Sequence, residues 1–284
     1  MSRASQDYKS AVKPIWCPGC GNYGAMKALT QAFLDLDIAP ESIALVSGIG
    51  CSGRMSHFFN TYSLHGTHGR AVPTALGVKA ARPDLTVLAV GGDGDGLSIG
   101  GGHISHAARK NTNITYLLLD NRIYGLTKGQ ASPTTDFGHK TKTSPFGVDE
   151  PPMDALPAFI VYDATFVARS STVHVAELTE LLKAGILHKG FSILHILTPC
   201  VTYPVFDART LKATLQPLPE DHDRKDKMAA IVRGYSTNPV FTGIFFQTEK
   251  PTLEERLEGQ AQPFAPERSG DELDMLRKVL YDFA

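Results

Sequence analysis

The chain has 284 residues, which is enough for one large α/β domain or one domain with an extension. Hydrophobic residues make up 42% and charged residues 20%, so the chain can bury a sizeable core and is not globally disordered. Its net charge of −1 argues against a strongly basic nucleic-acid-binding face. No apolar run approaches the roughly 20 residues of a membrane-spanning helix. Residues 1–13 are polar and resemble no secretory signal, so we expect a cytoplasmic protein with reduced thiols.

Apolar runs alternate with helical patterns through the first 200 residues, which predicts a mostly parallel sheet with helices on both faces. The predicted elements are, in chain order, a helix over 24–36, a strand over 43–47, a helix over 74–82, a strand over 85–90, a helix over 98–109, strands over 114–120 and 159–166, a helix over 175–188 and a strand over 192–197. The polar connection 128–157 is long, and connections of that length are usually functional.

The composition shifts beyond about Tyr203. Residues 220–227 are charged, residues 243–247 are apolar, and residues 271–280 are typical of a terminal helix. We therefore expect one binding domain over residues 1–204. Residues 205–284 are predicted to form an extension that packs on this core or on a partner.

A first glycine motif, GIGCSG over residues 48–53, matches the GxGxxG pattern of dinucleotide-binding sites. Such a site also needs an acidic residue about 20 positions further on, to bind the ribose. No Asp or Glu occurs between Glu41 and Asp84, which argues against a dinucleotide. The glycines can still present backbone N–H groups to another phosphate.

A second glycine region is more informative. The strand over 85–90 leads into Gly92-Asp93-Gly94, and Asn121 follows the next strand. Because adjacent parallel strands end at the same edge of a sheet, Asp93 and Asn121 are expected to face one crevice. Both offer hard oxygen atoms, which Mg²⁺ prefers together with phosphate oxygens. The alternative interpretation is two ordinary turns capped by Asp and Asn.

Four cysteines form the third pattern: Cys17 and Cys20 in a CxxC, Cys51 inside the first glycine motif, and Cys200 after the last core strand. Four thiols can bind one zinc ion or one 4Fe–4S cluster, and spacing alone does not separate the two. Cys51 and Cys200 could also be simply buried. Their positions at strand ends place them at the edge where the ligand crevice is expected.

The second glycine region resembles the thiamine diphosphate (TPP) motif, in which GDG is followed by an Asn-bearing loop, here DNRIYG over residues 120–125. The resemblance implies that Asp93, Asn121 and the backbone carbonyl of Ile123 bind Mg²⁺. It also implies that the protein contacts the cofactor through a set of loop residues. These are Ile49, Gly50, Ser52, His68, Gly94, Asp95, Gly125 and Leu126.

The whole set of motifs resembles the β subunit of the 2-oxoacid:ferredoxin oxidoreductases, over roughly the first 200 residues. The matching stretches are WCPGCGN (16–22), GIGCSGR (48–54), HGTHGRAVPTALGVK (65–79), GGDGDGLSIGGGH (91–103), LLDNRIYGLTKGQASPT (118–134) and the LTPC that ends at Cys200. The resemblance implies that the four cysteines bind one 4Fe–4S cluster. It further implies that TPP promotes decarboxylation of a 2-oxoacid, that electrons pass through the cluster to ferredoxin, and that coenzyme A accepts the acyl group.

The same resemblance implies a partner. TPP enzymes use a Glu to activate the cofactor, and the sequence offers no convincing candidate, since Glu41 precedes the first strand. In the resembled family the α subunit supplies it, within an α2β2 heterotetramer. Leu126 and Lys128 resemble the substrate residues of members that act on 2-oxoglutarate, whereas pyruvate members typically carry Asn at the Leu126 position. A pyruvate or broad-range enzyme, a non-redox TPP decarboxylase or carboligase, and a zinc-stabilised binding subunit remain alternatives.

Overall fold

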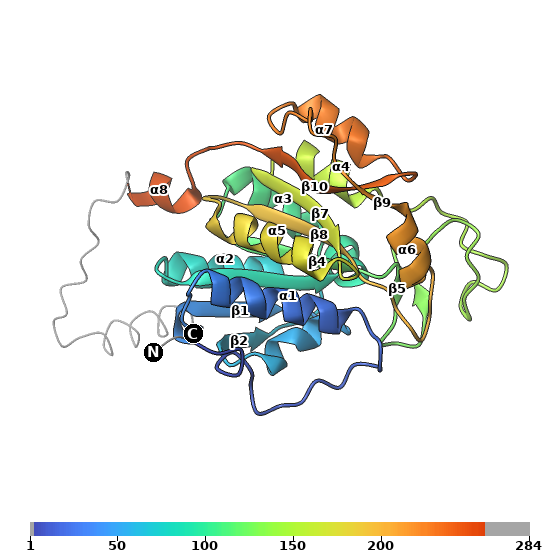
Figure 1. The fold of residues 1–284 in the computed structure, drawn as a ribbon, viewed down its shortest axis with the longest axis horizontal. Coiled ribbons are helices and arrows are strands. Elements are labelled where there is room, and N and C mark those ends of the chain that lie inside the picture. Colours follow the sequence, from blue (N-terminus) through green and yellow to red (C-terminus); the bar gives the residue numbers. More distant parts are fainter. Residues whose placement is uncertain (1–2, 259–284) are drawn as a thin grey trace, which may run out of the picture.

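The computed structural model describes residues 3–258, and one eight-stranded sheet runs through them (Figure 1). The strands, from edge to edge, are β2 (Tyr62–His65), β1 (Ile43–Ser47), β3 (Thr86–Gly92), β4 (Thr115–Asp120), β8 (Ser192–Leu197), β7 (Phe166–Ser171), β10 (Val240–Gln247) and β9 (Leu215–Pro217). All neighbouring pairs are parallel except β7 and β10. The predicted mostly parallel α/β class is confirmed.

The central strands are buried on both faces, which is why they appear in the sequence as continuous apolar runs. Along β3, Leu88 and Val90 pack into one half of the core, whereas Val87 and Ala89 pack into the other. Side chains alternate in the same way along β1 and β4.

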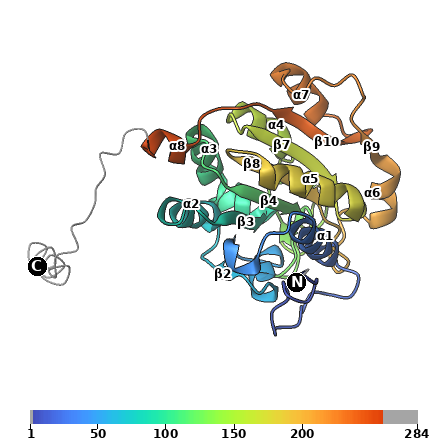
Figure 2. The same cartoon turned by 60° about the vertical axis from the view of Figure 1, so that its left-hand side comes forward.

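Two groups of helices cover the two faces of the sheet. Figure 2 gives a second view of this arrangement. One face carries α1 (Asn22–Asp35) and α5 (Val175–Leu187). The other carries α2 (Ala71–Ala81), α3 (Gly101–Lys110), α4 (Ala155–Val161) and α7 (Lys227–Gly234). The described part of the chain contains no helix both long and apolar enough to cross a membrane.

The remaining elements are short. They are the helical turns η1 (Pro40–Ser42), η2 (Ser52–Phe58) and η3 (Gly94–Ile99), the helices α6 (Ala208–Thr214) and α8 (Leu253–Glu258), and the hairpin strands β5 (Ile123–Tyr124) and β6 (Gln130–Ala131). Both β9 and β10 belong to the main sheet, so residues beyond Tyr203 extend the core sheet directly. The division into a binding domain that ends at residue 204 and an extension that begins at residue 205 stays a prediction.

One predicted strand is wrong. Residues 159–166 contain the end of α4, a turn, and only the first residue of β7. Asp163 adopts φ +70° in that turn, and its N–H bonds back to Ile160, which ends the helix. A short apolar run is compatible with a buried helix as well as a buried strand. Here its first part ends helix α4 and its last residue begins strand β7. The helix predicted over residues 271–280 lies outside the described residues.

Candidate functional site

The carboxyl ends of β3 and β4 bring Asp93 and Asn121 together. The two strands pair in parallel with Gly92 opposite Leu119, so the chain leaves both strands at neighbouring points. The backbone N–H of Asn121 donates to Oδ1 of Asp93 at 3.4 Å. The N–H of Ile123 in turn donates to Oδ1 of Asn121 at 3.0 Å. The structure thus gathers all three predicted Mg²⁺ ligands at one edge of the sheet, and their role as ligands stays a prediction.

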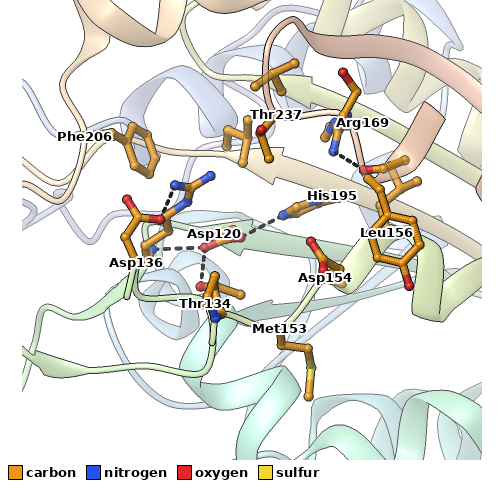
Figure 3. Close-up of a pocket in the computed structure, with 18 of the residues that line it drawn as sticks. Asp120, Thr134, Asp136, Met153, Asp154, Leu156, Arg169, His195, Phe206 and Thr237 are labelled. Carbon is orange, nitrogen blue, oxygen red and sulfur yellow. Dashed lines mark hydrogen bonds and ion pairs between the residues drawn. The ribbon is translucent and has the colours of Figure 1, made fainter. Parts of the chain in front are cut away.

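Two buried carboxylates lie side by side at this edge. Asp93 and Asp120 are each only 2% exposed. The hydroxyl of Thr134 lies between them, 3.0 Å from Oδ2 of Asp93 and 2.9 Å from Oδ1 of Asp120. Nε2 of His195 lies 2.8 Å from the other oxygen of Asp120 (Figure 3). Because the Thr134 hydroxyl carries one proton, it cannot satisfy both carboxylates fully.

The two carboxylates differ in their electrostatics. Burial, and after it the neighbouring Asp120 carboxylate, raises the pKa of Asp93 to about 7. Burial also disfavours the charge of Asp120, but the hydrogen bond and charge of His195, with the charge of Arg122, outweigh it and lower the pKa of Asp120. Asp93 is therefore the carboxylate whose negative charge is left uncompensated, and a hard cation bound to it would supply the missing positive charge.

Replacing Thr134 with valine tests this arrangement. Valine keeps the shape of the side chain but removes the hydroxyl that contacts both carboxylates. We expect the free energy of unfolding of the cofactor-free protein to fall by about 1–3 kcal/mol. Thr134→Ser keeps the hydroxyl and loses one methyl group, which costs about 0.8 kcal/mol. Urea denaturation measures both, and equal losses in the two variants would show that the hydroxyl contributes nothing.

A cavity of about 70 Å³ opens beside Asp93, and we call it the strand-end cavity. Among the predicted cofactor contacts, its walls include Ile49, Gly50, Ser52, His68, Gly94, Asp95 and Leu126. Gly125 is not part of the walls. The loops predicted from the motifs therefore meet at one place, with Gly125 just outside it.

Asp95 holds two of these loops in place. Its Oδ1 accepts hydrogen bonds from the backbone N–H of Ile49 at 2.9 Å and of Gly69 at 2.7 Å. Nδ1 of His68 also lies 3.2 Å from the same oxygen. Gly50 adopts φ +101°, and no atom lies within 4 Å of the position that a Cβ would take there. This bare backbone at the cavity wall is suited to the close approach of an anionic ligand.

Tyr124 and Asn22 are among the wall residues that were not predicted individually. The ring of Tyr124 packs against Gly94, where a Cβ would come within 2.2 Å of Cε1, and its hydroxyl donates to the Gly94 carbonyl at 3.1 Å. Asn22, the first residue of α1, is buried and also lines the cavity. Both residues belong to stretches quoted in the sequence analysis, but a shared motif does not indicate which member faces a ligand.

The four thiols lie near one another, and one of them lines the strand-end cavity. Burial raises the pKa of Cys51 to about 11, and Cys20, Cys200 and Cys17 each add to the rise. The position of a Cβ on Gly125 would be 3.6 Å from Sγ of Cys200 and 3.8 Å from Sγ of Cys51. Cys51 also lines the cavity itself. Within residues 3–258, no three His, Cys, Asp or Glu side chains are grouped closely enough to hold a single metal ion.

Lys128 and Leu126 are not in the same cavity. Leu126 lines the strand-end cavity and is 43% exposed. Lys128 is exposed, adopts φ +84°, and lines a separate cavity of about 320 Å³ with Lys140 and Tyr203. The two predicted substrate residues therefore face different spaces in this chain, and their roles stay predictions.

The residues present fit the groups that the motifs imply. A buried, charge-uncompensated carboxylate at Asp93, with Asn121 in the wall of the same cavity, suits Mg²⁺. The bare backbone at Gly50 suits a diphosphate. The four neighbouring free thiols are the ligand type of an iron–sulfur cluster, and within residues 3–258 they are not grouped closely enough for a single metal ion.

Comparison with known proteins identifies the family. Residues 48–196 match the family described as thiamine pyrophosphate enzyme, C-terminal TPP binding domain. Residues 200–262 match the C-terminal part of the pyruvate ferredoxin oxidoreductase beta subunit. A 2-oxoacid:ferredoxin oxidoreductase β subunit from Aeropyrum pernix is 39% identical over 90% of this chain and 85% of its own length. A 2-oxoglutarate synthase subunit KorB from Methanocaldococcus jannaschii is 39% identical over 86% of this chain and 91% of its own length.

A solved structure is similar as well. It is the 2-oxoglutarate:ferredoxin oxidoreductase from Magnetococcus marinus with 2-oxoglutarate, coenzyme A and succinyl-CoA bound. It matches with a TM-score of 0.90 and 40% identity, covering 97% of this chain and 95% of that one. From these matches, which cover the fold, the glycine loops and the residues after Cys200, the chain belongs to the TPP-binding β subunits of the 2-oxoacid:ferredoxin oxidoreductases.

Proposed function

We propose that the chain is the β subunit of a 2-oxoglutarate:ferredoxin oxidoreductase that carries both TPP and one 4Fe–4S cluster. The reaction converts 2-oxoglutarate and coenzyme A to succinyl-CoA, CO₂ and one proton, and two electrons reduce two ferredoxins. The observation that carries the proposal is the position of Cys51, which lines the strand-end cavity and also neighbours the other three thiols. One residue therefore belongs to both the cofactor cavity and the thiol group.

In this proposal the chain's own residues hold the diphosphate end of the cofactor. Asp93, Asn121 and the carbonyl of Ile123 would hold Mg²⁺, and the backbone at Gly50 would face the phosphates. The side chain of Asp95 keeps the loop of Ile49 in position for that contact. When bound, TPP supplies an electron sink for the decarboxylation of a 2-oxoacid.

The four cysteines would hold the cluster. Cys51 and Cys200 approach the backbone at Gly125, directly after the predicted Mg²⁺ loop, so electrons leaving the cofactor would have a short path to the thiols. The indole N–H of Trp16 donates to the carbonyl of Cys51 at 2.7 Å and fixes the backbone there. A single zinc ion at the same thiols could not accept electrons, and it would favour the non-redox alternative.

The activating Glu is proposed to come from an α subunit in an α2β2 assembly. Among residues 3–258, no Glu contributes to the walls of the strand-end cavity. Coenzyme A and ferredoxin are proposed as further partners, because the similar Magnetococcus marinus structure has coenzyme A bound and carries ferredoxin in its name. Some similar chains are named for 2-oxoglutarate and others more broadly for 2-oxoacids, which is why substrate preference needs a direct test.

The test is the anaerobically purified complex of this chain with its α subunit. We expect about four iron and four sulfide ions per β chain. We also expect ferredoxin reduction that depends on coenzyme A and is faster with 2-oxoglutarate than with pyruvate. One zinc and no iron would overturn the redox proposal, and a preference for pyruvate would overturn the substrate.

Replacing Lys128 with methionine tests the proposed preference for 2-oxoglutarate independently of the decarboxylation reaction itself. If Lys128 pairs with the distal carboxylate of 2-oxoglutarate, the variant raises KM for 2-oxoglutarate about tenfold or more and leaves KM for pyruvate unchanged. Lys140→Met is the matched control, since Lys140 lines the same cavity. Equal kinetics for both variants and the wild type would exclude Lys128 from substrate binding, in line with its position outside the strand-end cavity.

A further inference from the structure

A second cavity of about 340 Å³, drawn in Figure 3, shares no wall residue with the strand-end cavity. We call it the arginine pocket. Arg169 of β7 and His195 of β8 line it, together with Asp120, which ends β4. Apolar side chains form much of the remaining wall, among them Met153 and Phe206. Of the labelled residues in this pocket, the activity proposed above uses none directly.

Arg169 is a buried cation with hydrogen-bonding capacity to spare. Its side chain is 6% exposed, and the guanidinium lies 4.9 Å from the centroid of the Phe245 ring. Nε donates to the carbonyl of Phe241 at 2.8 Å and Nη1 to that of Gly234 at 3.3 Å, but Nη2 has no partner within the described residues. No carboxylate in this part of the chain forms an ion pair with it, so the charge lacks a counter-ion.

His195 also has a buried nitrogen atom without a partner in the described residues. It is 7% exposed, and Nε2 donates to Asp120 at 2.8 Å, since a carboxylate only accepts. The other ring nitrogen, Nδ1, is buried with no hydrogen-bond partner in the described part of the chain. Two buried nitrogen atoms from neighbouring strands, Nη2 of Arg169 and Nδ1 of His195, are thus left unsatisfied beside one cavity. Groups of this kind are costly unless a ligand or water completes them.

Most of the carboxylates that line the pocket already form hydrogen bonds or ion pairs within the protein. Asp120 accepts from His195 and Thr134, and Asp136 forms an ion pair with Arg122 at 2.6 Å. Asp154, the remaining carboxylate of the wall, is exposed to solvent and lies beyond ion-pair distance from Arg169. Arg169 therefore adds to the wall a buried guanidinium that has no ion-pair partner in the described residues, whereas the buried carboxylate of Asp120 already has His195 and Thr134 as partners.

We propose that the arginine pocket binds a small oxyanion, a carboxylate or phosphate group, through Arg169. The guanidinium presents a free N–H to such a group, and the Nδ1 atom of His195 on the neighbouring strand lies beside the same cavity. The apolar wall leaves room for a short carbon chain behind the anionic group. This site is separate from the strand-end cavity, and it does not depend on bound TPP, Mg²⁺ or an iron–sulfur cluster.

The test is calorimetric titration of the purified complex of the full chain and its α subunit, at constant ionic strength. Sodium phosphate and sodium succinate are the two probes, one for each source of the oxyanion. We expect saturable binding of at least one probe, with one site per β chain. The probe that binds identifies the source, and the absence of saturable binding for both would overturn the proposal.

Variants of Met153 locate the binding without disturbing the core. Met153 is 46% exposed and lines the pocket. Met153→Glu adds a negative charge at the wall and is expected to weaken binding about tenfold or more, whereas Met153→Gln, of similar size and neutral, is expected to change it less than about twofold. Arg169→Lys should also weaken binding, but it removes structural hydrogen bonds as well. Binding that is equally strong in Met153→Glu and Met153→Gln would place the anion elsewhere.

Discussion

Replacing Asp93 with asparagine is expected to reduce ferredoxin-reducing activity by at least about 100-fold. Loss of a residue that merely supports a metal ligand typically costs 10–100-fold, and Asp93 is itself proposed to be a ligand. The variant is expected to lose Mg²⁺-dependent TPP binding in calorimetry, measured on the complex with the α subunit. Asp149→Asn, a change of one exposed carboxylate, is the matched control and should leave activity unchanged.

The same substitution should not destabilise the cofactor-free protein. Asp93 is buried beside Asp120 and its pKa is raised to about 7, well above the ordinary value of 3.8. Between these two pH values the folded state binds more protons than the unfolded state. The contribution of Asp93 to the stability of the folded state is therefore full below about pH 4, and it is lost as pH rises through about 7. Asparagine is neutral throughout and lacks this dependence.

Thermal unfolding after removal of divalent cations measures the effect. Wild-type protein should lose stability between pH 5 and pH 8 relative to Asp93→Asn, and Mg²⁺ with TPP should restore it at pH 8. A variant that is less stable than the wild type at pH 8, with unchanged TPP binding, would show that Asp93 is a structural residue and not a ligand. A residue that lowers stability while serving the site is a common feature of functional positions.

The sequence predicted β1, β4 and β8 well because each is a continuous apolar run buried on both faces. The bounds of β1 and β8 match the prediction, and β4 differs by one residue at its start. The prediction failed at β7, which is buried along its whole length but carries Arg169, Ser170 and Ser171 in place of an apolar run, and also where a strand is exposed. Edge strand β2 is exposed along its whole length, so it carries no apolar run. The misassigned stretch 159–166 failed because a helix end and a strand start share one apolar segment.

At the site, spacing predicted which loops meet but not the side-chain network beneath them. Asp93 and Asn121 follow directly from adjacent parallel strands. Thr134 lies 41 residues after Asp93 and reaches it only because the loop after β6 folds back, a contact that no local pattern encodes. His195 had a signal, since it is a polar residue inside the buried apolar strand β8. That pattern indicates a buried partner, which the structure identifies as Asp120.

Replacing Cys17 with alanine is expected to abolish electron transfer while sparing cofactor binding. Cys17 is the exposed member of the four thiols, so its removal leaves the buried packing around Cys20 and Cys51 intact. We expect the variant, purified anaerobically with the α subunit, to lose or damage the cluster and to reduce ferredoxin at least about 100-fold more slowly than wild type. Iron and sulfide counts and the absorption spectrum measure the cluster directly.

A matched control comes from the residue that contacts the same thiol. The hydroxyl of Thr202 donates to Sγ of Cys17 at 3.1 Å, so Thr202→Val removes a hydrogen bond but no proposed ligand. It should keep the full iron count and shift only the reduction potential, because hydrogen bonds to sulfur tune that potential. TPP binding by calorimetry should be unchanged in both variants, since Cys17 does not line the strand-end cavity. If Cys17→Ala retains full iron and ferredoxin reduction, Cys17 is not a ligand and the four-thiol centre is wrong. If it loses TPP binding together with iron, the thiols support the fold of the cofactor site instead of carrying electrons from it.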